Sequence, residues 1–236
     1  MPEVKITLSA NAGVCIQAAG KKIWVDALFS GADVGFSPMS PELAQRVLAS
    51  AAFAEPDHIC YTHCHPDHYS RVLTAAAMEK WPNAKLYLPE TEFGEQTLIS
   101  GEEMCVTDGR LTLRFLRLPH EGMQYAHVKH YGLLLTADGR NILLPGDCAL
   151  GSPVLAQAVA GQKIHLAIVD FPWITLRGGR AFLEQYVRPD HLIGYHLPFA
   201  EDDKNGFRIS AAKAVQSMAG DVRLLWEPMQ TDTIKI

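Results

Sequence analysis

The segment CYTHCHPDHYS, residues 60–70, constrains this chain more than any other stretch of its sequence. It places three histidines and an aspartate within six positions, namely His63, His65, Asp67 and His68. On a surface, protonated imidazoles so close together would repel one another, and in a core each polar group would need a hydrogen-bond partner. A metal site avoids both penalties, because imidazole and carboxylate are common metal ligands. The segment therefore predicts a metal centre, and the remaining ligands have to come from elsewhere in the chain.

The spacing of these residues indicates two groups of ligands. His63 and His65 stand two apart after a short apolar strand, so in an extended chain their side chains point to the same side. Pro66 disfavours helix for the residue before it and helps to end the extended run. Asp67 and His68 follow where we expect a helix to start, and adjacent helical side chains diverge by about 100°. The strand end can thus face one metal and the helix start a second; zinc suits such ligands, as do iron and manganese.

Hydrophobic periodicity predicts strands at the front of each half of the chain and alternating strands and helices behind them. Ser40 and Pro41 suit the N-cap and first position of a helix, and Asp138-Gly139 is a typical hairpin turn within 131–147. We expect further strands at 4–9, 13–18, 22–26, 57–63, 85–89, 111–119, 164–170, 191–195 and 222–226. We expect helices at 40–53, 68–81, 90–98, 178–187 and 207–219. No linker divides the sequence, so these elements predict a single domain, residues 1–236, with two sheets and helices outside them.

The composition is that of an ordinary globular protein, with 48% hydrophobic and 20% charged residues. No apolar run approaches the roughly 20 residues that span a bilayer, so we expect no association with a membrane. The N-terminal stretch lacks the basic start and apolar block of a signal peptide. The five cysteines are scattered without a CxxC pair. These features predict a cytoplasmic protein with reduced thiols, and the net charge of −5 gives no general attraction to nucleic acid.

The motif THCHPDH, residues 62–68, resembles the HxHxDH signature of the metallo-β-lactamase fold superfamily. Four further segments resemble that superfamily in the right order: the opening strands that end at Asp26, LRLPH with His120, ILLPGDC with Asp147, and DHLIGYHLP with His196. The resemblance extends over most of the chain. It implies an α/β (α+β) fold, a four-layer αβ/βα sandwich of two mixed β-sheets flanked by helices, which agrees with the order of elements above.

The same resemblance implies which residues bind metal. Asp147 and His196 each follow an apolar stretch, which suits side chains presented at a strand end. Catalytic roles would fall to Asp67, which would orient the nucleophile, and to Asp147. Seven side chains would hold two divalent metal ions: His63, His65 and His120 at the first, Asp67, His68 and His196 at the second, and Asp147 at both.

The third histidine of the first site leaves alternatives open. His120, His127 and His130 all lie between two predicted strands, and any of them could face the metals. His120 directly follows an apolar strand and best matches the position of the histidine in the superfamily. His127 and His130 then suit contacts to the substrate or to a metal ligand, or a solvated loop.

Three other polar residues are candidates for supporting roles. Asp26 resembles an acidic residue that supports the HxHxDH loop, since metal-binding imidazoles need an acceptor for their other N–H; a plain turn role is equally open. Asp170 ends a predicted strand and Arg177 stands near a predicted helix start, where an anionic group of a substrate could bind. The alternative for Asp170 and Arg177 is an ordinary strand–loop–helix connection with exposed arginines.

Two divalent metals about 3.5–4 Å apart lower the pKa of a bridging water and so supply hydroxide at neutral pH. The sequence therefore predicts a metal-dependent hydrolase, most readily with zinc, that cleaves an ester, lactone, thioester, amide or phosphodiester of a small, uncharged-to-anionic metabolite. One alternative is a nuclease or phosphodiesterase like RNase Z, which the negative net charge disfavours. Another is an iron-dependent redox enzyme of the same fold. The oligomeric state stays open, a homo-oligomer included.

Overall fold

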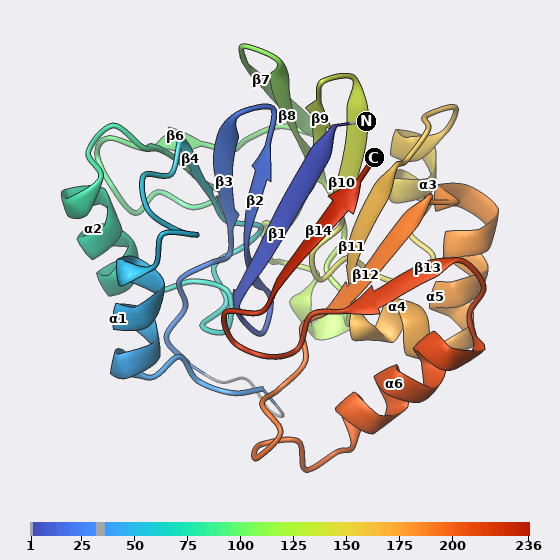
Figure 1. Ribbon diagram of the computed structural model, residues 1–236. Coiled ribbons are helices and arrows are strands. Elements are labelled where there is room, and N and C mark those ends of the chain that lie inside the picture. Colours follow the sequence, from blue (N-terminus) through green and yellow to red (C-terminus); the bar gives the residue numbers. More distant parts are fainter. Residues whose placement is uncertain (1, 32–35) are drawn as a thin grey trace.

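The computed structural model describes residues 2–31 and 36–236, and over these residues the strands form two seven-stranded sheets packed face to face (Figure 1). The first sheet has the order β14-β1-β2-β3-β4-β5-β6. Its strands are Thr231–Lys235, Glu3–Ala10, Gly13–Ala18, Lys21–Val25, His58–Cys60, Lys85–Leu88 and Thr97–Leu98. The second sheet has the order β13-β12-β11-β10-β9-β8-β7. Its strands are Asp221–Leu224, His191–Tyr195, Leu166–Asp170, Arg140–Leu144, Tyr131–Ala137, Leu111–Arg117 and Glu103–Asp108.

Both sheets change from antiparallel to parallel pairing at their middle strand. In the first sheet β14, β1, β2 and β3 pair antiparallel, and β3, β4, β5 and β6 pair parallel. In the second sheet β7, β8, β9 and β10 pair antiparallel, and β10 to β13 pair parallel. The carboxyl ends of parallel strands lie at the same edge of a sheet, which is where such folds bind ligands. Each sheet therefore contributes one such edge.

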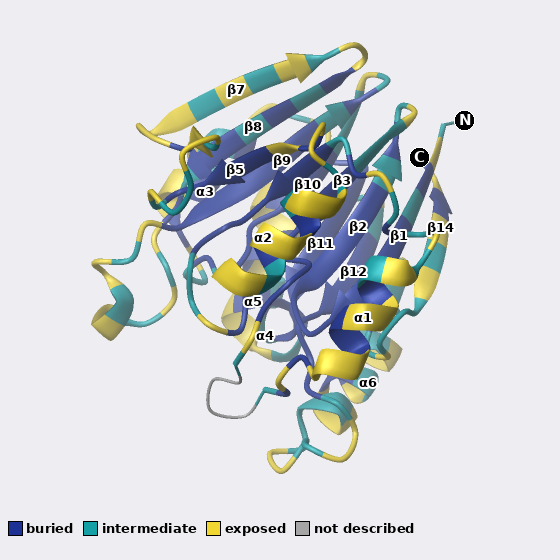
Figure 2. Cartoon of the chain, turned by 90° about the vertical axis from the view of Figure 1, so that its left-hand side faces the viewer, coloured by how far each residue is buried: buried dark blue, intermediate teal, exposed yellow. Residues whose placement is uncertain are grey.

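Helices cover the outer face of each sheet, as Figure 1 shows on both sides of the sandwich. Helices α1 (Pro41–Ala49) and α2 (Arg71–Lys80) bury Val47 and Ala77 against Trp24 and other apolar residues of the first sheet. Figure 2 shows α1 with a buried face toward the sheet and an exposed face outward. The second sheet is covered by α3 (Pro153–Val159), α4 (Phe171–Thr175), α5 (Arg177–Phe182) and α6 (Phe207–Ser217). This four-layer arrangement confirms the predicted αβ/βα sandwich.

The core between the sheets is built from the inward-facing residues of alternating strand positions. Leu8 and Ile16 of the first sheet and Leu133 and Ile168 of the second are each no more than 1% exposed and belong to one apolar cluster. Full burial of such a side chain stabilises the fold by about 1.5–3 kcal/mol. The period-two pattern that predicted these strands is thus the pattern of core contacts.

The helix predicted at 90–98 is wrong. These residues form a loop that ends in the two-residue strand β6. The side chain of Gln96 organises the loop: its Oε1 accepts from the N–H groups of Glu92 and Phe93, and its Nε2 donates to the carbonyl oxygen of Glu90. Hydrogen bonds from one side chain to three backbone groups replace those that a helix would have made.

The other predicted helices differ from the structure mainly at their ends. Helix α1 stops at Ala49 rather than at residue 53, because the extended backbone of Ser50 ends it. The segment predicted as one helix at 178–187 is α5 followed by a π-helical turn, Leu183–Val187. Strands β7 and β14 and helices α3 and α4 had no counterpart in the expectations; β7 and β14 are edge strands with only weak apolar alternation.

Among the described residues, no helix combines the length and apolar character needed to cross a bilayer.

Candidate metal centre

The predicted metal ligands lie where several strands finish. Asp26 directly follows β3, residues 63–68 follow β4, and His120 comes shortly after β8. Asp147 comes shortly after β10, and His196 directly follows β12. Because β3 and β4 are parallel neighbours, and β10, β11 and β12 are too, their carboxyl ends lie side by side. Parallel pairing aligns the strand ends within each sheet, and the packing of the two sheets then brings residues 63–68 and His196, more than a hundred residues apart in sequence, to one place.

The sequence suggested that a helix begins at Asp67 and His68, and this prediction is wrong. They lie in a turn in which the N–H groups of His68 and Tyr69 donate to the carbonyl oxygen of His65, at 3.0 and 2.9 Å. Helix α2 starts only after Ser70, whose hydroxyl accepts from the N–H of the third residue beyond it. A tight turn, rather than a helix, therefore directs these two side chains.

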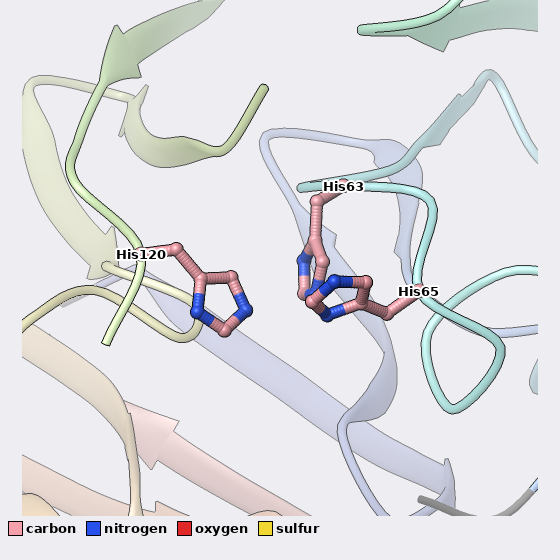
Figure 3. A group of neighbouring side chains, drawn as sticks. All are labelled: His63, His65 and His120. Atoms are coloured by element: carbon pink, nitrogen blue, oxygen red, sulfur yellow. The ribbon is translucent and has the colours of Figure 1, made fainter. Parts of the chain in front are cut away.

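His63, His65 and His120 form the first group of side chains (Figure 3). Their nearest ring nitrogens all lie within 4.8 Å of one another. His63 and His65 extend from the loop after β4, and His120 approaches from the segment after β8. His63 is buried, whereas the other two are partly open to solvent. Three imidazoles so arranged suit one divalent cation.

Asp67, His68, Asp147 and His196 form the second group, again with one ligand atom of each within 4.8 Å of the others. Oδ2 of Asp67 lies 3.7 Å from Nε2 of His68 and 3.7 Å from Nε2 of His196. His196 has a left-handed backbone conformation, with φ of 59°, and its ring stacks on Phe36 with centroids 4.2 Å apart. The structure therefore brings together all seven residues that the resemblance implied as ligands.

Asp147 stands between the two groups. Its Oδ2 lies 3.7 Å from Nε2 of His120 and 4.0 Å from Nε2 of His63. Its Oδ1 lies 3.2 Å from Nε2 of His68 and 3.8 Å from Nδ1 of His196. One carboxylate oxygen thus faces each group, which is the arrangement that a carboxylate shared between two cations requires.

Asp26 holds the HxHxDH loop from below. Its Oδ1 accepts from the N–H of Thr62 at 2.7 Å, and its Oδ2 accepts from the Thr62 hydroxyl at 2.6 Å and from Nδ1 of His68 at 3.0 Å. The carboxylate is fully buried. Since Nδ1 of His68 donates to Asp26, Nε2 is the nitrogen that faces Asp147, at 3.2 Å from its Oδ1. The structure therefore shows contacts between Asp26 and this loop, beyond a plain turn.

His120 is oriented in a similar way by backbone groups. Its Nδ1 donates to the carbonyl oxygen of Glu121 at 2.7 Å, which leaves Nε2 free to face the first group. The segment is tied to the strand end that carries Asp147, because the N–H of Glu121 donates to the carbonyl oxygen of Asp147 and His120 forms a β-bridge with Cys148. Both groups of side chains are thus pre-organised by hydrogen bonds behind them.

The site holds buried polar atoms that lack a hydrogen-bond partner. Buried polar atoms without partners are rare and costly, about 1–3 kcal/mol each, and call for an explanation such as a bound ion. Metal coordination would satisfy these atoms, so the residues fit divalent cations. The atoms are Oδ1 of Asp67, Nε2 of His68, Nε2 of His120, Oδ1 of Asp147 and Nε2 of His196.

The histidines and aspartates of the site shift one another's pKa values. Burial by itself would lower the pKa of His68, but the carboxylates of Asp147 and Asp26 outweigh burial and hold that pKa well above its usual value. Burial by itself would raise the pKa of Asp147, but His68 and His196 hold it well below its usual range. Burial, together with the imidazole of His68, places the pKa of His63 well below its usual value, so His63 is neutral, the form that binds metal.

The remaining candidates lie outside the two groups. His130 is buried, its Nδ1 bonds the carbonyl oxygen of Leu118, and burial lowers its pKa to about 3. His127 is exposed in the loop before β9. Asp170, at the end of β11, is buried with Oδ1 3.9 Å from Nδ1 of His196. Arg177 is exposed at the first residue of α5 and does not line the cavity at the site.

A cavity of about 440 Å³ opens onto both groups. Tyr125, which the sequence did not single out, lines it with its ring centroid 5.0 Å from that of His65 and 4.8 Å from that of His120. Tyr125 belongs to a single 3₁₀ turn, Met123–Tyr125, after Gly122, whose φ is 88°. A turn this short has no periodicity, and only the glycine before it hinted at a sharp change of direction.

Neither a family model nor a curated protein matches this chain. Solved structures do match it. Igni18, described as a novel metallo hydrolase from the archaeon Ignicoccus hospitalis, is 17% identical with a TM-score of 0.68, over 99% of each chain. YhfI, a metallo-β-lactamase fold protein from Bacillus subtilis, is 13% identical with a TM-score of 0.65, over 99% of this chain and 100% of YhfI.

A third structure is CmlA, a diiron β-hydroxylase from Streptomyces venezuelae. It is 15% identical with a TM-score of 0.66, and the match covers 99% of this chain but 54% of CmlA. This chain therefore has the metallo-β-lactamase fold, which confirms the fold that the resemblance in its sequence implied.

Proposed function

We propose that this protein is a metal-dependent hydrolase that uses two divalent ions. The observation that carries the proposal is the position of Asp147, with one oxygen toward His63 and His120 and the other toward His68 and His196. A shared carboxylate and a set of imidazole and carboxylate ligands on each side of it are what a two-metal hydrolytic site needs. The likeness to Igni18, described as a metallo hydrolase, supports the same reading.

Asp147 would contact both ions. His63, His65 and His120 would hold the first, and Asp67, His68 and His196 the second. When bound, the ions lower the pKa of water and polarise the scissile bond, which supplies a nucleophile near neutral pH.

The other steps belong to side chains of the chain itself. Asp67 has two carboxylate oxygens: one would bind the ion, and the other would accept a hydrogen bond from the attacking water and orient it. Asp26 accepts from Nδ1 of His68 and so orients the ring with Nε2 as the nitrogen that would bind the ion. The walls of the cavity hold the substrate and shield the reacting groups from bulk water.

Zinc is the metal we propose first, and manganese or iron would also suit these nitrogen and oxygen ligands. A cavity of about 440 Å³ suits a small molecule rather than a polymer. The reacting bond would be an ester, lactone, thioester, amide or phosphodiester.

Metal content and turnover test the proposal together. The zinc-loaded protein should hold two equivalents of metal and hydrolyse at least one generic substrate of these classes. Asp147→Asn should lose metal and reduce kcat by at least about 100-fold, the upper end of the effect of losing an outer partner of a metal ligand. The control is Asp138→Asn in the β9–β10 turn, where φ is 51° and asparagine is tolerated. A single equivalent at saturating zinc, or equal activity in Asp147→Asn, would contradict the two-metal proposal.

An iron-dependent oxidation is the second candidate, because CmlA, described as a diiron β-hydroxylase, shares this fold. The same histidine and carboxylate donors suit iron. Loading the protein with Fe²⁺ without oxygen and then adding oxygen separates the two functions. Oxygen uptake that depends on an added organic substrate would favour oxidation, whereas hydrolysis with zinc and no oxygen uptake with iron would favour the hydrolase.

A further inference from the structure

Beyond the proposed metal ligands, the cavity at the site has a largely apolar wall. Phe171 and Phe207 lie side by side there with ring centroids 4.6 Å apart, and Trp173 and Leu150 continue the same wall. Phe36 adds a further ring, stacked nearly parallel on that of His196 at an interplanar angle of 6°. These rings come from α4, α6 and the segment before α1, so several parts of the fold converge on an apolar surface.

The described residues that line this cavity include no lysine and no arginine. The acidic side chains in the lining are Asp67 and Asp147, the exposed Glu121, and Asp170, which is buried 3.9 Å from His196. The arginine next to Phe207 is engaged elsewhere. The guanidinium of Arg208 donates to the carbonyl oxygens of Pro198 and Trp226 and pairs with Glu227.

The apolar wall and the lack of a cationic side chain in the described lining decide which substrates can enter the cavity without a large desolvation penalty. The positive charge of two bound cations would be offset by the carboxylates of Asp67 and Asp147, by Glu121 at the rim and by the hydroxide that the cations supply. An anionic substituent away from the reacting bond would then lose its water without gaining a cationic partner, and a buried unpaired charge is costly. An apolar or aromatic substituent, by contrast, would gain contact with Phe171 and Phe207.

We propose that the site takes an uncharged substrate whose non-reacting part is apolar or aromatic, and that it discriminates against anionic substrates. This inference rests on the proposed hydrolase function, because it concerns the same cavity. The sequence analysis allowed an uncharged or an anionic metabolite, and this inference favours the uncharged one.

A matched pair of esters tests the charge preference directly. The substrates are 4-nitrophenyl esters of arylacetic acids that carry either a methyl group or a carboxylate at the para position of the acyl ring. The leaving group and the scissile bond are the same in both. With zinc-loaded enzyme, and with each rate divided by the hydroxide-catalysed rate, kcat/KM for the methyl ester should exceed that for the carboxylate by at least about tenfold. Equal values, or a preference for the carboxylate, would overturn the inference.

Binding of the corresponding amides separates this inference from the proposed function. Titration calorimetry with zinc-loaded protein compares the para-methyl and the para-carboxylate arylacetamides, once incubation with the protein has shown that both amides stay intact. If no substrate of the proposed classes is hydrolysed, the hydrolase proposal fails, yet tighter binding of the neutral amide would still support an uncharged ligand. Equal or tighter binding of the anionic amide would overturn the inference whatever the kinetics show.

A single charge added at the rim provides the control within the protein. Gln124 lines the cavity from the 3₁₀ turn, is exposed, and belongs to neither group of proposed ligands. Gln124→Arg should reduce the preference for the neutral ester by several-fold, because it gives the carboxylate a cationic partner. Gln124→Met, of similar length and without charge, should leave the preference unchanged. The same change in both variants would contradict an electrostatic origin.

Discussion

The surroundings of each histidine decide whether its side chain can reach the proposed metal centre. Three histidines lie between β8 and β9, and their environments differ sharply. His120 presents a free Nε2 to the first group, His127 is exposed, and His130 is buried with Nδ1 bonded to the carbonyl oxygen of Leu118. His120 and His130 both bond a backbone carbonyl oxygen through Nδ1 and leave Nε2 without a partner, so hydrogen bonding does not separate them. At the level of single residues, position decides: of these three histidines, His120 is the one with a ring nitrogen within 4.8 Å of those of His63 and His65.

Replacing each of these histidines by alanine should give three different results. His120→Ala should lose about one equivalent of metal per chain, because it removes one of three ligands from the first site. His127→Ala should keep two equivalents and unchanged stability. His130→Ala should keep the metal but lower the free energy of unfolding by about 2–4 kcal/mol, since it leaves a cavity in the interior.

Metal analysis after dialysis and chemical unfolding measure these outcomes side by side. The assignment of His120 would be wrong if His127→Ala or His130→Ala lost an equivalent of metal while His120→Ala kept both.

At the level of secondary structure, the pair of parallel strands β3 and β4 carries both the loop with four proposed ligands and the aspartate that supports it. Asp26 follows the end of β3 and bonds Thr62 and His68 beyond the end of β4. At the opposite end of the same pair, Asp57 accepts from the backbone N–H of Lys22. Each aspartate thus accepts from a backbone N–H at one end of the β3–β4 pair, but only Asp26 of the two contacts the loop with the proposed ligands.

Asp26→Asn should weaken zinc binding by about 10–100-fold, as the loss of an outer partner of a metal ligand usually does. The amide has one acceptor oxygen, whereas the carboxylate accepts three hydrogen bonds here, so the position of His68 becomes less defined. Asp57→Asn is the matched control and should leave zinc affinity unchanged. Competition with a chromophoric chelator measures both affinities, and an equal loss in the two variants would speak against a specific role for Asp26.

At the level of the whole molecule, the proposed ligands come from both sheets. The loop after β4 belongs to the first sheet, while His120, Asp147 and His196 follow strands of the second. Metal bonds would therefore link the two halves of the sandwich at one end, and the apolar core links them along the strands. Metal bound only by the folded chain stabilises it by mass action.

Removing the metal should lower the melting temperature of the protein. Free zinc at 100 times its Kd would contribute about 2.7 kcal/mol, which for a chain of this size shifts Tm by about 5–10 °C. Thermal unfolding followed by circular dichroism, with zinc or with a chelator, measures the shift. Asp147→Asn should show a smaller shift than wild type, and identical Tm values with and without chelator would contradict folding-linked metal binding.

Much of the fold could be predicted because its signals are local. Ser40 caps α1, Asp138 and Gly139 turn the β9–β10 hairpin, and the two-residue period of the buried strands recurs in the sequence. Each of these features depends on residues within a few positions of one another, so the sequence alone is enough to predict them. The spacing of His63 and His65 is likewise local, and it predicted a metal centre before any tertiary contact was known.

Contacts between distant segments decided the rest. The choice of His120 depends on the pairing of its segment with the strand end at Asp147. The cavity wall joins Phe36 to Phe207, which local patterns cannot bring together. Hydrophobic periodicity specifies which face of a strand or helix is buried, but not which neighbour buries it. The ligand groups and the character of the cavity therefore emerge only when parallel pairing aligns the strand ends in each sheet and the two sheets pack together.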